Sequence, residues 1–144
     1  MSDFIDTGPE LGNKADEFNS RLHIKEICEA CDIFLKEPEI DYKQGWAAII
    51  EEMLHGLKGY NILLTSIISD YGQLDTQFMI AKGVRAAKVY HAIDVARIRS
   101  RSTCMGCGDF GFREIRGDKV LVMCRGCRAI MEAKGETGTW LDKY

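Results

Sequence analysis

The spacing of apolar residues predicts helices over the first part of the chain. From residue 16 to about residue 36, apolar side chains recur at intervals of three and four, which is the period of an amphipathic helix. Pro38 ends that pattern, because proline cannot continue a helix. Asp41 can cap a second helix, whose apolar positions continue from Trp46 through to Ile68. The N-terminal half is therefore predicted to be helical.

Residues 74–101 are also helical by composition, but their apolar face is not continuous. One apolar stripe ends near Gly83 and another begins at Val89. The preceding segment, 69–73, has the composition of a turn. We therefore expect a mainly α fold, with an N-terminal helical domain of about three to four helices over residues 16–101.

The character of the sequence changes toward the C-terminus. Glycine becomes frequent, and the segments 110–115 and 120–123 are rich in β-type residues on either side of a polar turn, ArgGlyAspLys. A β-hairpin is therefore predicted, and a third strand can follow at 129–133. Residues 102–144 would form a small C-terminal unit with a short tail, and residues 1–15 a flexible N-terminal tail.

Four cysteines flank the predicted hairpin in two pairs. They are spaced Cys104-x2-Cys107-x16-Cys124-x2-Cys127, and each pair can make a tight turn that brings two sulfurs to one point. Four thiolates in two close pairs match the tetrahedral preference of Zn²⁺. An iron site of the rubredoxin type uses similar ligands and stays open as an alternative. A helix-borne redox pair or a cytosolic disulfide fits this spacing less well.

Two such turns joined by a hairpin resemble the zinc-ribbon family over residues 102–134. We expect one structural zinc, because four cysteines leave no coordination position open for water or substrate. The chain also lacks the His-x-Glu motif of the zinc deaminases. The three histidines lie in different segments and nothing in the sequence places any of them beside a nucleophile or a carboxylate, so we expect no enzyme; they are His23, His55 and His91.

Cys28 and Cys31 form a further Cys-x-x-Cys pair, on the apolar face of the first predicted helix. Buried free cysteine behaves as a small hydrophobic residue, which favours a role in the core. A second metal site completed by His23 or His55 is the alternative.

The net charge of −3 hides an acidic first part and a basic second part. Residues 1–80 hold 6 Lys/Arg against 15 Asp/Glu, whereas residues 81–144 hold 13 against 7. This asymmetry indicates that the basic part faces nucleic acid, although the two parts can also neutralise each other within the fold. The basic segment is 82–101. The side chains expected to contact nucleic acid are Lys82, Arg85, Lys88, Arg97, Arg99, Arg101, Arg113 and Arg116.

The segment GVRAAKVYHAI, residues 83–93, resembles the second half of a helix-turn-helix motif. In that motif a glycine lies in the turn and apolar residues anchor the recognition helix, and here Gly83, Val84 and Val89 occupy those places. The resemblance implies a helix that enters a major groove. One continuous basic helix that tolerates Gly83 is the alternative.

A basic segment beside a zinc site with two Cys-x-x-Cys turns also resembles the late-gene antiterminators of lambdoid phages, over residues 74–134. The resemblance rests on the four cysteines and on the basic residues before them, and it implies binding to DNA and to RNA polymerase. No apolar run reaches the roughly 18 residues of a membrane span, and the N-terminus lacks the pattern of a signal peptide, so we expect a cytoplasmic protein.

Together these patterns predict a zinc-containing regulator of transcription that binds nucleic acid, with duplex DNA favoured. Its acidic helical part would dock RNA polymerase or another protein, or pair with a second copy in a homodimer. The alternative is a zinc-stabilised protein-interaction module, an adaptor or inhibitor that does not bind nucleic acid.

Overall fold

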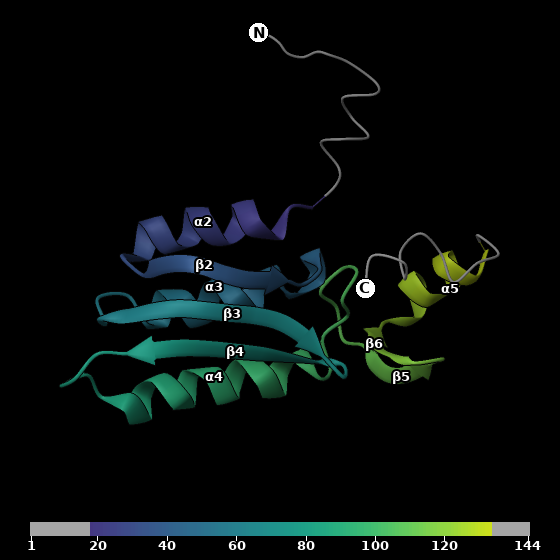
Figure 1. The fold of residues 1–144 in the computed structure, drawn as a ribbon. Helices are drawn as coiled ribbons and strands as arrows, with labels where there is room; N and C mark the ends of the chain where they lie inside the picture. Colours follow the sequence, from purple (N-terminus) through teal and green to yellow (C-terminus); the bar gives the residue numbers. More distant parts are fainter. Residues whose placement is uncertain (1–17, 134–144) are drawn as a thin grey trace, which may run out of the picture.

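The computed structural model describes residues 18–133 and contains four α-helices, one 3-10 helix and two β-sheets within that range (Figure 1). The elements run along the chain in the order α2 (Ser20–Cys31), β2 (Phe34–Asp41), the 3-10 helix η1 (Gln44–Trp46), α3 (Ala47–Gly56), β3 (Ile62–Asp70), β4 (Gln73–Ile80), α4 (Ala86–Ser100), β5 (Phe112–Arg116), β6 (Lys119–Met123) and α5 (Arg125–Ala133). The predicted tails, 1–15 and the stretch after 133, lie outside the described residues.

The prediction of a mainly α fold is wrong, because two of the predicted helical segments contain strands. The second predicted helix ends at Gly56, and the residues after it form β3. The segment 74–101 begins as β4 and becomes helical only at Ala86. In β4 the apolar face is the alternating series Leu74, Thr76, Phe78 and Ile80, which is the period of a strand. The protein is therefore an α/β fold.

The first predicted helix is confirmed in shorter form as α2. Its side chains at intervals of three and four are buried, as the spacing predicted. Asn19 caps the N-terminus by accepting a hydrogen bond from the backbone N–H of Leu22 at 3.0 Å. Asp32, at φ 59°, ends the helix in the left-handed conformation, and its N–H bonds the carbonyl of Cys28. The helix therefore ends before Pro38, through a C-cap.

The larger sheet has the strand order β2-β3-β4. β2 pairs with β3 in parallel, and α3 lies in the crossover between them, as a parallel connection requires. β3 and β4 are antiparallel and joined by a two-residue turn, Tyr71 and Gly72, both with positive φ. The turn predicted at 69–73 is confirmed at this point.

The helices cover one face of this sheet and leave the other face open. α3 packs against both α2 and α4, while α2 also packs on β2 and α4 on β4. The covered face buries Leu64, Ile67 and Leu74. On the open face Phe34, Leu63 and Met79 are register partners across the three strands. Phe34 is 61% and Met79 63% exposed.

The predicted hairpin is confirmed by β5 and β6, which are antiparallel and joined at Gly117. The predicted third strand at 129–133 is wrong, because that segment belongs to α5. The helix-turn-helix and the continuous basic helix are both wrong, because the strand β4 precedes the turn at Gly83. In Figure 1 the hairpin and α5 lie beyond the C-terminal end of α4. No helix within residues 18–133 is long and apolar enough to cross a membrane.

Candidate functional site

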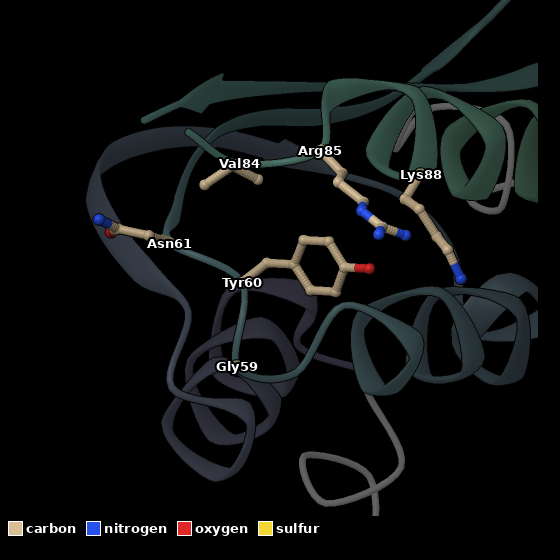
Figure 2. Close-up of a pocket in the computed structure, with 6 residues that line it drawn as sticks. All are labelled: Gly59, Tyr60, Asn61, Val84, Arg85 and Lys88. Atoms are coloured by element: carbon tan, nitrogen blue, oxygen red, sulfur yellow. The ribbon is translucent and has the colours of Figure 1, made fainter. Parts of the chain in front are cut away.

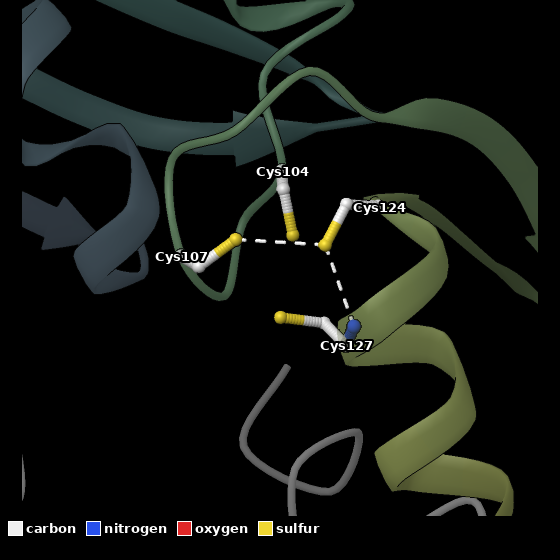
Figure 3. Close-up of side chains that lie close together, drawn as sticks. All are labelled: Cys104, Cys107, Cys124 and Cys127. Atoms are coloured by element: carbon white, nitrogen blue, oxygen red, sulfur yellow. Dashed lines mark hydrogen bonds between the residues drawn. The ribbon is translucent and has the colours of Figure 1, made fainter.

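The four cysteines Cys104, Cys107, Cys124 and Cys127 come together at one point between the hairpin and α5 (Figure 3). Their sulfur atoms all lie within 4.8 Å of one another, and those of Cys107 and Cys124 are 3.5 Å apart. Four sulfurs at about 2.3 Å from a tetrahedral zinc would be about 3.8 Å apart. The donor set therefore fits a metal of this kind without rearrangement of the backbone.

The first pair of cysteines lies in a tight loop between α4 and β5. The N–H of Cys104 donates to the carbonyl of Asp109 at 2.6 Å, and the N–H of Gly108 donates to the carbonyl of Cys104 at 3.0 Å. Gly108 has a φ of 89°, which favours glycine, so the turn is made just after Cys107. The N–H of Gly106 also points at the sulfur of Cys104, at 3.3 Å. This loop is therefore shaped by its own backbone to present two sulfurs.

The second pair lies where β6 meets α5. The backbone N–H of Cys127 donates to the sulfur of Cys124 at 3.3 Å. This hydrogen bond is the main cause that lowers the pKa of Cys124 from 9.0 to about 7. Thiolate is the form that ligates metal, so Cys124 is the cysteine best prepared to do so.

Two hydrogen bonds and one close contact hold the first cysteine loop against the η1 segment. The N–H of Gly45 donates to the carbonyl of Met105 at 2.9 Å, and the indole N–H of Trp46 donates to the carbonyl of Thr103 at 2.8 Å. Gly45 leaves no room for a side chain, because a Cβ there would lie 2.0 Å from the carbonyl oxygen of Cys104. Cys104 is fully buried at this contact.

The turn between β3 and β4 makes a second contact with the hairpin. A Cβ at Gly72 would lie 2.8 Å from a methyl group of Val120, and the guanidinium of Arg113 donates two hydrogen bonds to the carbonyl of Tyr71, at 3.2 and 2.7 Å. The buried core is continuous across both contacts and includes Leu121, Val122 and Met123.

Cys28 and Cys31 are buried on α2, which fits their predicted role in the core. Burial is the main cause that raises the pKa of Cys28 to about 12. The sulfur of Cys31 lies 3.4 Å from Nδ1 of His55. Among residues 18–133, the Cys104 cluster is the one group of three or more metal-ligating side chains with suitable geometry. The described residues therefore give no second metal site at Cys28 and Cys31.

His23 takes part in a separate network. Its Nδ1 lies 2.5 Å from the hydroxyl of Tyr42, and its Nε2 lies 2.7 Å from a carboxylate oxygen of Glu51. Burial raises the pKa of Tyr42, so the phenol keeps its proton and can donate to the imidazole. The network joins α2 to α3, whereas His91 is exposed on α4.

Three of the arginines predicted to contact nucleic acid form ion pairs within the chain. Arg97 pairs with Asp94 at 2.7 Å, and Arg99 pairs with Glu52 of α3. Arg116 pairs with Glu114 at 2.7 Å and with Glu132 of α5 at 3.3 Å. A carboxylate already balances each of these charges.

Two more of the predicted arginines have neutral partners. Arg101 donates to the side-chain oxygen of Gln73 at 2.8 Å, and Arg113 donates to the carbonyl of Tyr71. These hydrogen bonds fix the side chains but leave their charge uncompensated.

The remaining predicted residues, Lys82, Arg85 and Lys88, gather where α4 begins, and they form no ion pair within the described part of the chain. Arg85 and Lys88 line a pocket of about 420 Å³ together with Tyr60 and Val84 (Figure 2). Sequence reasoning missed Tyr60, and no local signal marks it. The pocket exists because the loop after α3 meets the loop before α4.

Sequence reasoning also missed an exposed aromatic pair beside the cysteine cluster. Phe110 and Phe112 are 67% and 53% exposed, and their rings meet edge to face with centroids 5.1 Å apart. Two large exposed aromatic side chains side by side are a feature of binding surfaces.

The chain was compared with protein-family models, with curated proteins and with solved structures. No family model, curated protein or solved structure matches it, so the four clustered cysteines support a metal-binding motif, and neither the zinc-ribbon family nor the phage antiterminators are supported as its family.

Proposed function

We propose that this protein binds nucleic acid, that its four-cysteine site holds one structural Zn²⁺, and that its phosphate contacts come from the start of α4. Zinc would bind Cys104, Cys107, Cys124 and Cys127, and four thiolates would close its coordination shell. A closed shell supplies stability instead of catalysis, because no position remains for a reacting water.

The metal would join three parts of the molecule. The loop of Cys104 is held to the η1 segment through Gly45 and Trp46, whereas Cys127 lies in the first turn of α5. A metal bound by both cysteine pairs would therefore tie α5 and the hairpin to the α/β part of the fold.

The observation that carries nucleic-acid binding is the distribution of uncompensated cations. Arg97, Arg99 and Arg116 are paired with carboxylates, whereas Arg85 and Lys88 are exposed and have no acidic partner among the described residues. Phosphate binding releases counterions in proportion to the number of phosphates neutralised, and a cation already balanced by a carboxylate contributes less to that number. Within the basic segment, Arg97 and Arg99 are therefore paired with carboxylates, whereas the cations near Tyr60 are not; Arg101 is bonded only to the neutral Gln73.

The test is a salt titration of binding, measured by fluorescence anisotropy with labelled duplex DNA, single-stranded DNA and RNA. The double variant Arg85→Ala/Lys88→Ala should weaken binding and reduce the slope of log K against log salt by about 1.4 to 1.8. The matched control, Arg97→Ala/Arg99→Ala, removes the same formal charge from the same basic segment and should change the slope less. No binding at low salt, or equal slopes for the two double variants, would contradict the proposal.

A protein-interaction module is the second candidate, and the exposed pair Phe110 and Phe112 favours it. In that case the anisotropy assay should show no binding to any nucleic acid at low salt. The double variant Phe110→Ser/Phe112→Ser should then lose a stoichiometric protein partner that the wild type and the Arg85→Ala/Lys88→Ala variant both retain.

A further inference from the structure

We propose that the pocket at the start of α4 binds one nucleotide of a single strand, with its phosphate between Arg85 and Lys88 and its base against the ring of Tyr60. This inference rests on the proposed function and specifies the form of nucleic acid that this surface takes. It also changes the preference for duplex DNA that the sequence suggested.

Backbone hydrogen bonds form the walls of the pocket before any ligand arrives. Two loops meet there, one between α3 and β3 and the other between β4 and α4, and the N–H of Ala81 donates to the carbonyl of Asn61 at 3.2 Å across them. Within the loops, the N–H of Tyr60 donates to the carbonyl of Leu57 and that of Val84 to the carbonyl of Ala81. Gly59, at φ 87°, makes the turn that places Tyr60 at the pocket.

Two cationic side chains and one phenol border this pocket. Figure 2 shows the guanidinium of Arg85, just before α4, beside the hydroxyl end of Tyr60; the side chain of Lys88 runs downward to one side of the ring, and that of Asn61 points away. Arg85 is the N-cap residue of α4 and Lys88 lies in its first turn, so both like charges border the same hollow and repel each other without an anion between them. The hydroxyl of Tyr60 has no hydrogen-bond partner among the described residues. A phosphate bound between Arg85 and Lys88 would relieve that repulsion.

The size and lining of the pocket indicate more than a phosphate. The pocket is a shallow, largely open hollow of about 420 Å³ and not an enclosed cavity, which suits a strand that lies along the surface. The ring of Tyr60 and the side chain of Val84 give it an apolar wall beside the cationic one. An aromatic side chain next to cations is the arrangement by which proteins bind single strands, through base stacking and phosphate contacts.

A duplex cannot use this pocket in the same way. Its base faces are stacked on one another inside the helix, so the ring of Tyr60 can stack only on a base that has left the duplex. Outer phosphates of a duplex could still meet Arg85 and Lys88, but Tyr60 would add nothing to that contact. Tyr60 therefore separates single-strand binding from charge attraction alone.

The experiment compares a labelled oligothymidine of about eight nucleotides with a duplex of equal length, using the full chain at fixed salt. Tyr60→Leu keeps an apolar side chain but removes the ring, and it should weaken binding of the single strand by roughly 5- to 150-fold without changing its salt slope. Tyr60→Phe keeps the ring and should stay near the wild type. Duplex binding should be weaker than single-strand binding and insensitive to Tyr60→Leu.

Lys88→Glu serves as a second variant, because it reverses an exposed charge while the ring stays in place. It should weaken binding of the single strand at least as much as Tyr60→Leu does, without change in the unfolding midpoint. Unaltered single-strand binding by Tyr60→Leu, or a duplex bound as tightly as the strand, would overturn the inference. A free nucleoside monophosphate bound as tightly as the strand would also overturn it.

The two proposals fail in different ways. If Arg85→Ala/Lys88→Ala weakens binding but Tyr60→Leu does not, the pocket inference fails and nucleic-acid binding stands. If neither change affects any nucleic acid, the proposed function itself fails.

Discussion

Replacing Gly45 with alanine should destabilise the fold and loosen the metal site together, because the η1 segment touches the first cysteine loop through its backbone. The new Cβ would lie 2.0 Å from the carbonyl oxygen of Cys104 and 2.5 Å from the carbonyl carbon of Met105. Overpacking of this kind costs about 1–3 kcal/mol. The backbone shift it forces would also break the hydrogen bond from Gly45 to Met105, worth about 0.5–1.5 kcal/mol. We therefore expect a loss of about 1.5–4.5 kcal/mol in the free energy of unfolding.

The loss is measured by urea unfolding, followed by the fluorescence of the buried Trp46 in a Trp140→Phe background. Zinc affinity is measured in parallel by competition with a chromogenic chelator, and it should fall because Cys104 must move. The matched control is Gly56→Ala in α3, where a Cβ meets no atom within 4 Å. That change should be neutral or stabilising by up to about 1 kcal/mol. If Gly45→Ala kept the stability and zinc affinity of the wild type, the close contact between Gly45 and the carbonyl of Cys104 would be refuted.

Three further outcomes are expected. Ser100 is fully buried, accepts a hydrogen bond from the N–H of Leu74 at 2.8 Å and donates one to the carbonyl of Arg97 at 2.6 Å. Ser100→Ala should therefore cost about 1–3 kcal/mol in urea unfolding. The exposed Ser102→Ala should stay within about 0.5 kcal/mol, and equal losses would contradict the assigned bond. Because the pKa of Cys28 is about 12 in the fold and near 9.0 in the unfolded chain, the native state keeps a proton that the unfolded chain releases. The contribution of Cys28 to stability is therefore lost as the pH rises above about 9, by up to 1.4 kcal/mol per pH unit. The free energy of unfolding of Cys28→Ala should decline less steeply with pH than that of the wild type. Parallel plots of unfolding free energy against pH for the two proteins would argue against this assignment. A strong chelator should lower the urea midpoint of the wild type but leave that of Cys124→Ser unchanged, and an equal drop in both would mean that the chelator acts elsewhere.

The sequence predicted α2 well and the larger sheet poorly, for a physical reason. Four apolar residues of α2 follow one helical stripe and are buried, whereas Leu22 lies off that face and is 52% exposed; the buried four are Ile24, Ile27, Cys28 and Cys31. In β3 the run from Ile62 to Ile68 fits a helical spacing and a buried strand equally well, so tertiary pairing decided between them. In β4, more buried and more exposed side chains alternate along the sequence, which indicates a strand. The composition of residues 74–101 predicted a helix there and was misleading.

The candidate site shows the same division between local and distant information. The cysteine spacing alone predicted the cluster, because each pair and the hairpin between them are local features. The partners of the arginines could not be predicted, since Arg99 meets Glu52 and Arg113 meets Tyr71 only after the chain has folded. The pocket at Tyr60 likewise combines two loops that are far apart in the sequence.

The metal content of the purified full-length chain is the most direct test of the structural zinc centre on which this account depends. Elemental analysis of protein prepared without chelator should find about one zinc per chain, and the double variant Cys124→Ser/Cys127→Ser should contain none. A wild-type chain that folds fully without metal, or a double variant with as much zinc as the wild type, would contradict the assignment of Cys104, Cys107, Cys124 and Cys127 as a structural zinc site.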